Sequence, residues 1–178
     1  MPLPLEDVHA RARRVRLLLL DVDGVLTDGG VAIRSTRDEH KTFFIRDGAA
    51  LVWARHEGLA VGLLSGRPSA ATSRRATELG ITIVSQGGPD KREGYAGILA
   101  SHGFSDEQVA YMGDDLLDLP ILARAGLSAS PADAVEDVRT RVHWVSRARG
   151  GRGAVRELVE LIFRARGRWD DIVRRYLV

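Results

Sequence analysis

One stretch decides the fold: Leu17-Leu18-Leu19-Leu20-Asp21-Val22-Asp23-Gly24. Four consecutive leucines that end in acidic residues are typical of a buried central strand with polar side chains at its carboxyl end. Asp21 and Asp23 are two residues apart, so on extended chain both side chains can face the same side. The stretch therefore predicts a parallel sheet with two carboxylates at its edge.

Short apolar runs and helical patterns alternate on the C-terminal side of this strand. Further strands are predicted over 59–64, 81–84, 109–112 and 126–129, and a hairpin over 29–33 and 41–45. Helices are predicted over 3–14, 48–57, 68–79, 90–102, 115–124, 153–164 and 169–176. This alternation indicates an α/β fold, a three-layer parallel sheet with helices on both faces.

The composition excludes several classes of protein. The 178 residues include no cysteine, so disulfides, thiolate metal sites and thiol chemistry are excluded. The mean hydropathy is −0.11, and no apolar run approaches the roughly 20 residues of a membrane span. The apolar run Leu17–Leu20 is too short for the core of a signal peptide, which leaves the cytoplasm as the expected location.

Positive charge is concentrated near the C-terminus. Residues 139–178 hold 11 basic and 4 acidic side chains, although the net charge of the chain is only +2. Such a segment can bind nucleic acid or supply cations to an anionic substrate or a neighbouring subunit. The aromatic residues do not interleave with these arginines as base-stacking platforms would, so we expect no nucleic-acid partner. We expect a single domain over 1–178, with a hairpin flap at about 28–46 and a basic tail at about 147–178.

Polar residues follow three of the predicted strands, in the segments 21–24, 65–67 and 113–115. In open α/β sheets the chemistry lies beyond these carboxyl ends. Acids at such places often only cap helices or begin turns, but two acidic clusters at one edge of a sheet favour a site. The residues Asp21, Asp23, Asp114, Asp115 and Asp118 bring up to five negative charges together. Two unit charges at about 4 Å repel by about 4 kcal/mol at an effective dielectric near 20, so the cluster should bind a hard cation such as Mg²⁺.

Two other features indicate anion binding. Of 26 basic residues only Lys41 and Lys91 are lysine, and Lys91 lies at a predicted helix start where a positive charge is unfavourable unless an anion needs it. An ordinary exposed lysine is the alternative. The turn Ser65-Gly66-Arg67 offers a hydroxyl and backbone N–H groups at a helix N-terminus, which is a cradle for phosphate, although a tight strand-to-helix turn would have the same residues.

The motifs resemble those of the haloacid dehalogenase-like (HAD) phosphatases, in the same order along the chain. Asp21-Val22-Asp23-Gly24-Val25-Leu26-Thr27-Asp28 resembles their first motif, Ser65 the second, Lys91 the third and Gly113-Asp114-Asp115-Leu116-Leu117-Asp118 the fourth. The resemblance implies a Rossmann-like fold and phosphate-ester hydrolysis by nucleophilic attack of Asp21. Asp23 is then general acid and base, and Ser65 and Lys91 hold phosphate oxygens. Mg²⁺ is implied at Asp21, the Asp23 carbonyl and Asp114, with Asp115 or Asp118 in support.

Two further segments make the resemblance more specific. Arg46-Asp47-Gly48 and Gly150-Gly151-Arg152-Gly153-Ala154-Val155-Arg156-Glu157 are similar to segments of the 3-deoxy-D-manno-octulosonate 8-phosphate (KDO 8-phosphate) phosphatases and of the phosphatases of nine-carbon keto-acid sugars. The chain differs from them at Ser65, where threonine is common, and at Phe44, where we expect a polar residue. By this resemblance Gly66, Arg67, Arg46, Asp47 and Arg152 are candidates for substrate binding, the arginines for a sugar carboxylate.

The spacing of the motifs leaves no room for a lid domain. Residues 24–64 and 66–90 separate the first three motifs, and each interval is shorter than the roughly 50 residues that an independent domain needs. We therefore expect a capless enzyme whose crevice is closed by a neighbouring subunit, and the resemblance implies a homotetramer. Two alternatives remain open: a signalling receiver module, which places its acids and lysine differently, and a phenylphosphate carboxylase-type subunit on the same fold.

Overall fold

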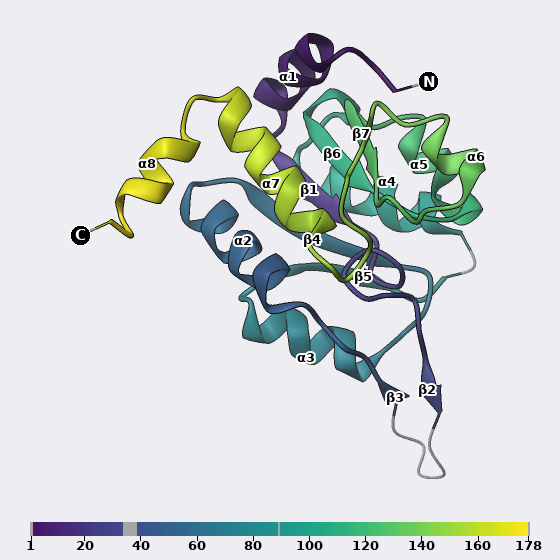
Figure 1. Ribbon diagram of the computed structural model, residues 1–178. Helices are drawn as coiled ribbons and strands as arrows, with labels where there is room; N and C mark the ends of the chain where they lie inside the picture. Colours follow the sequence, from purple (N-terminus) through teal and green to yellow (C-terminus); the bar gives the residue numbers. More distant parts are fainter. Residues whose placement is uncertain (1, 34–38, 89, 178) are drawn as a thin grey trace.

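The computed structural model describes residues 2–33, 39–88 and 90–177. Six parallel strands form the central sheet in the order β5-β4-β1-β6-β7-β8 (Figure 1). The strands are β1 (Leu17–Leu20), β4 (Ala60–Ser65), β5 (Ile83–Gln86), β6 (Val109–Met112), β7 (Leu127–Ser130) and β8 (Trp144–Val145). The predicted α/β fold with a parallel sheet is confirmed.

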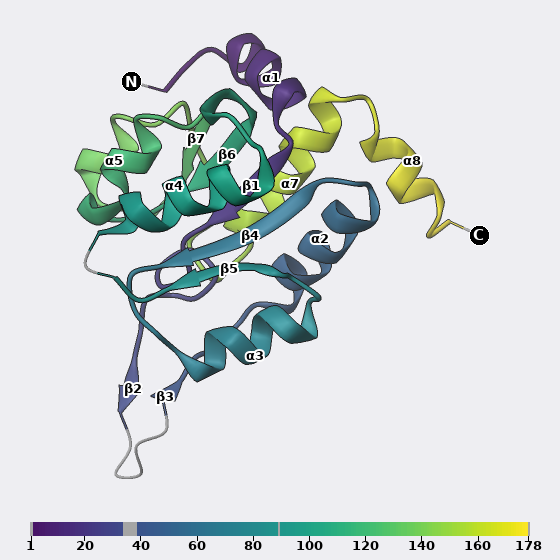
Figure 2. The ribbon, with the colours of Figure 1, turned by 180° about the vertical axis from the view of Figure 1, so that it is seen from behind.

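Helices cover both faces of this sheet (Figures 1 and 2). They are α1 (Leu5–Arg14), α2 (Ile45–His56), α3 (Ala70–Glu78), α4 (Lys91–His102), α5 (Leu119–Leu122), α6 (Glu136–Arg139), α7 (Ala154–Ala165) and α8 (Trp169–Arg174). Leu18 and Leu20 pack with α1, α2 and α7 on one face, and Leu17 and Leu19 pack with α4, α5 and α6 on the other. The four leucines are fully buried because side chains alternate across a strand that is covered on both sides.

The strand order places the chain reversal at β1. The chain runs from β1 outward to β4 and β5, and then returns to β6 on the other side of β1 before β7 and β8. Ligands of open α/β sheets bind beyond the strand ends at such a switch point. The end of β1, where Asp21 lies, is therefore the expected place for a site.

The segment between β1 and α2 differs in part from the prediction. Two short strands, β2 (Ala32–Ile33) and β3 (Glu39–His40), pair antiparallel, so the second strand precedes the predicted run 41–45. Phe43 instead packs against the core, and α2 begins at Ile45, three residues before the predicted start. Residues 34–38 lie outside the described residues, and the hairpin flap stays a prediction. Among the described residues no lid domain interrupts the sheet.

Other departures have local causes. The helix predicted over 115–124 is a 3₁₀ turn (Leu116–Asp118) followed by α5, since Pro120 has no N–H and occupies the start of a helix. β8 and α6 were not predicted, because each is too short for a periodic pattern. Within the described part of the chain, no helix has the length and apolar character needed to cross a membrane.

The C-terminal segment is part of the core. α7 packs against α1 and α2, and its residues Val155, Leu158, Val159 and Ile162 are fully buried. α8 follows it, and Trp169 lies edge-on to Trp53 of α2 with 6.0 Å between the ring centroids. The glycine-rich stretch before α7 contacts the loop after β1, because Gly151 donates a backbone hydrogen bond to the carbonyl of Val25. Three arginines of this segment, Arg156, Arg164 and Arg174, therefore lie on a packed helix pair.

Candidate active site

The strand register brings the three polar strand ends together. Leu20 pairs with Leu63 of β4 on one side and with Met112 of β6 on the other. Asp21, one residue beyond, continues the ladder by donating its N–H to the Met112 carbonyl at 3.0 Å. Ser65 and Asp114 each lie two residues beyond the partners of Leu20, so all three side chains reach the same end of the sheet.

Asp21 is a buried carboxylate paired with a lysine. Its exposed fraction is 6%, and Oδ1 lies 2.9 Å from the Nζ of Lys91, the first residue of α4. Burial, followed by the negative charge of Asp118, raises the pKa of Asp21 to about 6, although Lys91 offsets part of the shift. Burial disfavours the charged form of Lys91, but Asp21 and Asp118 outweigh it and raise the pKa of the lysine. The lysine therefore remains cationic beside the nucleophile candidate.

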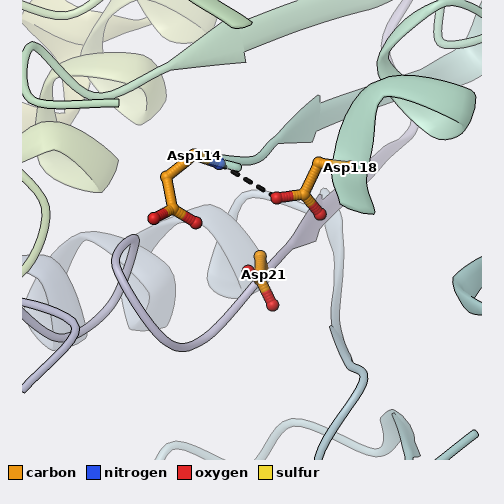
Figure 3. A group of neighbouring side chains, drawn as sticks. All are labelled: Asp21, Asp114 and Asp118. Atoms are coloured by element: carbon orange, nitrogen blue, oxygen red, sulfur yellow. Dashed lines mark hydrogen bonds between the residues drawn. The ribbon is translucent and has the colours of Figure 1, made fainter. Parts of the chain in front are cut away.

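Asp21, Asp114 and Asp118 form one acidic group (Figure 3). One carboxylate oxygen from each lies within 4.8 Å of the other two. Burial and the neighbouring charges of Asp21 and Asp118 raise the pKa of Asp114 to about 8. Ionised together, these groups repel each other, and their hard oxygen donors suit a divalent cation. The residues present thus fit a metal site.

Asp118 has a different task from the other two. Oδ1 accepts hydrogen bonds from Lys91 at 2.7 Å and from the hydroxyl of Tyr111 at 2.5 Å, and Oδ2 accepts from the backbone N–H groups of Asp114 and Asp115 at 3.0 and 3.3 Å. Both oxygens are fully engaged, so the side chain orients Asp114 and Lys91. Asp115 is exposed and caps the following turn, where its Oδ1 accepts the N–H of Leu116.

Glycines permit the close approach of these segments. Gly24 has a φ of 87°, and a Cβ there would collide with the carboxylate of Asp114. At Gly113 a Cβ would collide with Asp118. The loop after β1 is also held by hydrogen bonds of its own, since the hydroxyl of Thr27 accepts the N–H groups of Gly24 and Gly29. The glycine after Asp23 is thus required by geometry.

Asp23 pairs with a lysine that the sequence reasoning missed. The Nζ of Lys41 lies 2.7 Å from Oδ1 and 2.9 Å from Oδ2 of Asp23. The scarcity of lysine was a usable signal, because each lysine of this arginine-rich chain forms an ion pair with an acid of the first motif, Lys91 with Asp21 and Lys41 with Asp23.

The turn after β4 also contributes residues to the site, namely Ser65, Gly66 and Arg67. Ser65 is 4% exposed, and its hydroxyl donates to the carbonyl of Arg67 and accepts the Arg67 N–H. Gly66 lies beside the Lys91 side chain, since a Cβ there would be 3.7 Å from Lys91 Cε. The guanidinium of Arg67 pairs with Glu39 at 2.8 Å and lies 3.9 Å from Asp23.

A crevice of about 850 Å³ joins these groups. Its walls include Asp21, Asp23, Ser65, Gly66, Arg67, Lys91, Asp114, Asp115 and Asp118. Leu116 and Leu117 lie on its rim and are 54% and 67% exposed. The crevice offers a buried nucleophile candidate, a second carboxylate, one lysine and an acidic group that suits a metal ion. It suits attack on an anionic ester.

Known proteins share both the sequence and the fold. No protein-family model matches the chain. The 3-deoxy-D-manno-octulosonate 8-phosphate phosphatase of Yersinia pestis is 42% identical over 165 residues, which cover 93% of this chain and 88% of that protein. The relative from Escherichia coli K12 is 40% identical with the same coverage. The chain belongs to the KDO 8-phosphate phosphatase family.

Solved structures agree with this membership of the KDO 8-phosphate phosphatase family. The crystal structure from Yersinia pestis has a TM-score of 0.91 and 41% identity, and covers 93% of this chain and 89% of that chain. The enzyme from Moraxella catarrhalis, solved in complex with magnesium ion, phosphate ion and KDO, has a TM-score of 0.94 and 34% identity, with coverage of 97% and 99%. The predicted family, HAD-type fold and phosphatase class are confirmed.

Three candidates from the family resemblance lie away from the crevice. Asp47 is 1% exposed and accepts the N–H groups of Gly153 and Arg156, so it caps the start of α7. Arg46 is exposed and lies over the ring of Phe44. Arg152 lines a separate cavity of about 410 Å³ with Asp28, Asp133 and Arg149. The family resemblance suggested four charged residues for substrate binding. Of these, Arg67 lines the crevice, and Arg46, Asp47 and Arg152 do not.

Proposed function

We propose that this protein hydrolyses 3-deoxy-D-manno-octulosonate 8-phosphate to the free sugar and inorganic phosphate, with Mg²⁺. The observation that carries the proposal is the Asp21–Lys91 pair beside Asp114 and Asp118, in a chain of the KDO 8-phosphate phosphatase family. A buried carboxylate held by a lysine at the floor of an open crevice is suited to attack phosphorus. The reaction is phosphomonoester hydrolysis.

Asp21 is the nucleophile in this proposal. One carboxylate oxygen attacks phosphorus and forms an aspartyl-phosphate as the ester P–O bond breaks. Asp23 donates a proton to the leaving sugar oxygen, and then takes a proton from the water that attacks the aspartyl-phosphate and regenerates Asp21. Lys91 and the Ser65 turn offset the charge on the phosphate oxygens, which otherwise repel the incoming carboxylate.

The metal ligands in this proposal are Asp21, Asp114 and the backbone carbonyl of Asp23. Asp118 supports them by holding the backbone of Asp114, and Asp115 contributes less because it is exposed. When bound, Mg²⁺ would neutralise the acidic group and polarise the phosphoryl group. The magnesium ion of the Moraxella catarrhalis complex and the all-oxygen donor set support this choice of metal.

The eight-carbon sugar is favoured by the relatives, whose names give KDO 8-phosphate as substrate. We assign the sugar carboxylate to Arg67, which lines the crevice and carries a guanidinium able to bind a carboxylate with two hydrogen bonds. No observation favours a nine-carbon sugar or a carboxylase-type subunit. A small-molecule sugar phosphate is thus the partner that we propose.

Phosphate release tests the proposal. The protein is assayed with KDO 8-phosphate, a nine-carbon keto-acid sugar phosphate, phenyl phosphate and small phosphate esters, with Mg²⁺ and with EDTA. We expect the highest kcat/KM for KDO 8-phosphate, loss of activity in EDTA, and no turnover by Asp21→Asn. An active Asp21→Asn protein, shown by mass spectrometry to retain asparagine, would contradict the covalent mechanism.

We also propose that the crevice is completed by a second copy of the chain in a homotetramer. The described residues contain no lid, and Leu116 and Leu117 expose apolar surface at the crevice rim. Apolar side chains beside a site are often covered by a partner. Light scattering measures the mass of the assembly in solution. A stable monomer that also shows full, selective activity in the phosphate-release assay would rule this assembly out.

A further inference from the structure

Lys41 contacts both oxygens of Asp23 from a fully buried position. The exposed fraction of the Lys41 side chain is 0%, whereas that of Asp23 is 27%, and the two N–O distances are 2.7 and 2.9 Å. Lys41 donates a hydrogen bond to Oδ2 and lies within ion-pair distance of Oδ1, so it restrains where the Asp23 carboxylate lies. The lysine therefore lies behind Asp23, on the side away from the open crevice.

A chain of alternating charges holds Lys41 in this place. Its Nζ lies 3.3 Å from Oε1 of Glu39 and donates to the hydroxyl of Thr72 in α3 at 3.4 Å. The same oxygen of Glu39 accepts from Arg67 at 2.8 Å and from the hydroxyl of Ser69 at 3.4 Å. Glu39 belongs to β3, and Lys41 is the first residue after that strand. These contacts therefore connect the end of β3 to the turn after β4 and to α3.

Asp23 has few other restraints. Asp118, by comparison, accepts hydrogen bonds from a lysine, a tyrosine and two backbone N–H groups. Within residues 2–33, 39–88 and 90–177, the cations near the Asp23 carboxylate are Lys41 and, at 3.9 Å, the guanidinium of Arg67. Arg67 is half-exposed and already paired with Glu39. The orientation of Asp23 thus depends mainly on Lys41.

We propose that Lys41 is a positioning residue that orients Asp23 for proton transfer in both halves of the reaction. This inference rests on the proposed function and extends it to a residue outside the four motifs. In the first half the proton of Asp23 goes to the ester oxygen as the P–O bond breaks. In the second half Asp23 takes a proton from the attacking water while the bond between Asp21 and phosphorus breaks. A misdirected Asp23 slows both transfers.

The two halves can be separated by the choice of leaving group. p-Nitrophenolate leaves as a stable anion and needs little help from an acid, whereas a sugar alkoxide needs the proton. Hydrolysis of the aspartyl-phosphate needs the base with either substrate. Lys41→Met removes the charge and keeps an unbranched side chain of similar length in the buried site, so packing is largely preserved.

The experiment compares wild type, Lys41→Met and Arg74→Met with Mg²⁺, using KDO 8-phosphate and p-nitrophenyl phosphate. Arg74 is an exposed cation of α3 outside the crevice and serves as the matched control. We expect Lys41→Met to lower kcat for KDO 8-phosphate by about 10- to 100-fold, less than the roughly 10²–10⁴-fold effect of the acid–base group itself. With p-nitrophenyl phosphate we expect a burst of nitrophenolate and trapped phosphoprotein, since only the second half is slowed.

Each outcome bears on one of the two proposals. A wild-type protein that releases no phosphate from KDO 8-phosphate in Mg²⁺ contradicts the proposed function. An active wild type with equal loss on both substrates in Lys41→Met, and no burst, overturns the role of Lys41. If Lys41→Met fails to fold, Lys41→Gln is measured in the same way, because it keeps a hydrogen-bond donor that ends short of Asp23. The same burst is expected there, and its absence overturns the inference.

Discussion

Asp118 accepts four hydrogen bonds, from Lys91, Tyr111 and the N–H groups of Asp114 and Asp115. A fully engaged carboxylate next to a metal-ligand candidate acts by holding that ligand, and supporting groups of this kind typically change metal affinity by about 10- to 100-fold when removed. The sequence left the choice between Asp115 and Asp118 open, and we propose Asp118 as the supporting group because of these contacts.

We predict that Asp118→Ala raises the Mg²⁺ concentration for half-maximal activity by about 10- to 100-fold. The substitution removes one of the two acidic partners of Lys91 and leaves the Tyr111 hydroxyl and two backbone N–H groups without their acceptor, so kcat should fall as well. A titration of activity against Mg²⁺ measures the effect. Asp115→Ala is the control, and a smaller change is expected because Asp115 is exposed. A larger effect of Asp115→Ala would reverse the assignment.

The strand-end pattern was enough to predict most of the crevice. Asp21, Ser65, Lys91 and Asp114 were found from acids, a hydroxyl and a rare lysine placed after apolar runs, and the register of parallel strands brings such positions together. Lys41 could not be placed in this way, because its position depends on where the chain goes after β3. The contacts of Asp47 could not be predicted for a related reason, since its partners Gly153 and Arg156 are more than 100 residues away.

At the scale of elements, α7 depends on a cap from a distant part of the chain. Its N-cap residue, Gly153, has no side chain, and the N–H groups of Gly153 and Arg156 donate instead to the buried carboxylate of Asp47. Unsatisfied buried N–H groups cost about 1–3 kcal/mol. The aspartate of the Arg-Asp-Gly sequence at the start of α2 therefore has a structural role, because it caps α7.

We predict that Asp47→Ala lowers the free energy of unfolding by about 1–3 kcal/mol, because the start of α7 loses its acceptor. Urea denaturation followed by circular dichroism measures the change. Asp7→Ala is the control, since Asp7 is exposed in the first turn of α1 and should contribute only a few tenths of a kcal/mol. Unchanged stability with a raised KM would instead support the substrate-binding role suggested by the resemblance.

Elements with long periodic patterns were predicted well, and short ones were not. β1, β4, β6, α4 and α7 follow apolar runs or amphipathic repeats bounded by caps or glycines. β8 has two residues and α6 has four, and each exists because its neighbours pair with it or cover it. The start of α2 was missed because Phe44 offers no side-chain cap.

At the scale of the whole molecule, the acidic group links stability to pH and metal. Burial and like charge raise the pKa of Asp114 to about 8 and that of Asp21 to about 6, from 3.8 in both cases. The folded protein then binds these protons more tightly than the unfolded chain does. Without a cation, the contribution of these groups to stability is present at low pH and is lost as pH rises from about 4 to about 8.

We predict that Mg²⁺ raises the unfolding temperature more at pH 8 than at pH 5.5, because at the lower pH the ion must displace protons from Asp114 and Asp21. A ligand at 100 times its Kd stabilises by about 2.7 kcal/mol, which thermal unfolding detects easily. The measurement is repeated with Asp114→Asn, in which the dependence on pH should be much reduced. An equal shift at both pH values would show that the ion binds elsewhere.

The packing of Gly150 and Gly151 on the loop after β1 also bears on how the protein is made. A Cβ at either glycine would collide with backbone atoms of that loop, so the nucleophile's surroundings are completed by residues synthesised long after Asp21. Domains tend to fold as units while the ribosome releases them. A nascent chain that has emerged only as far as β8 lacks both α7, which covers one face of the sheet, and the finished loop, so catalytic competence should arise late in translation.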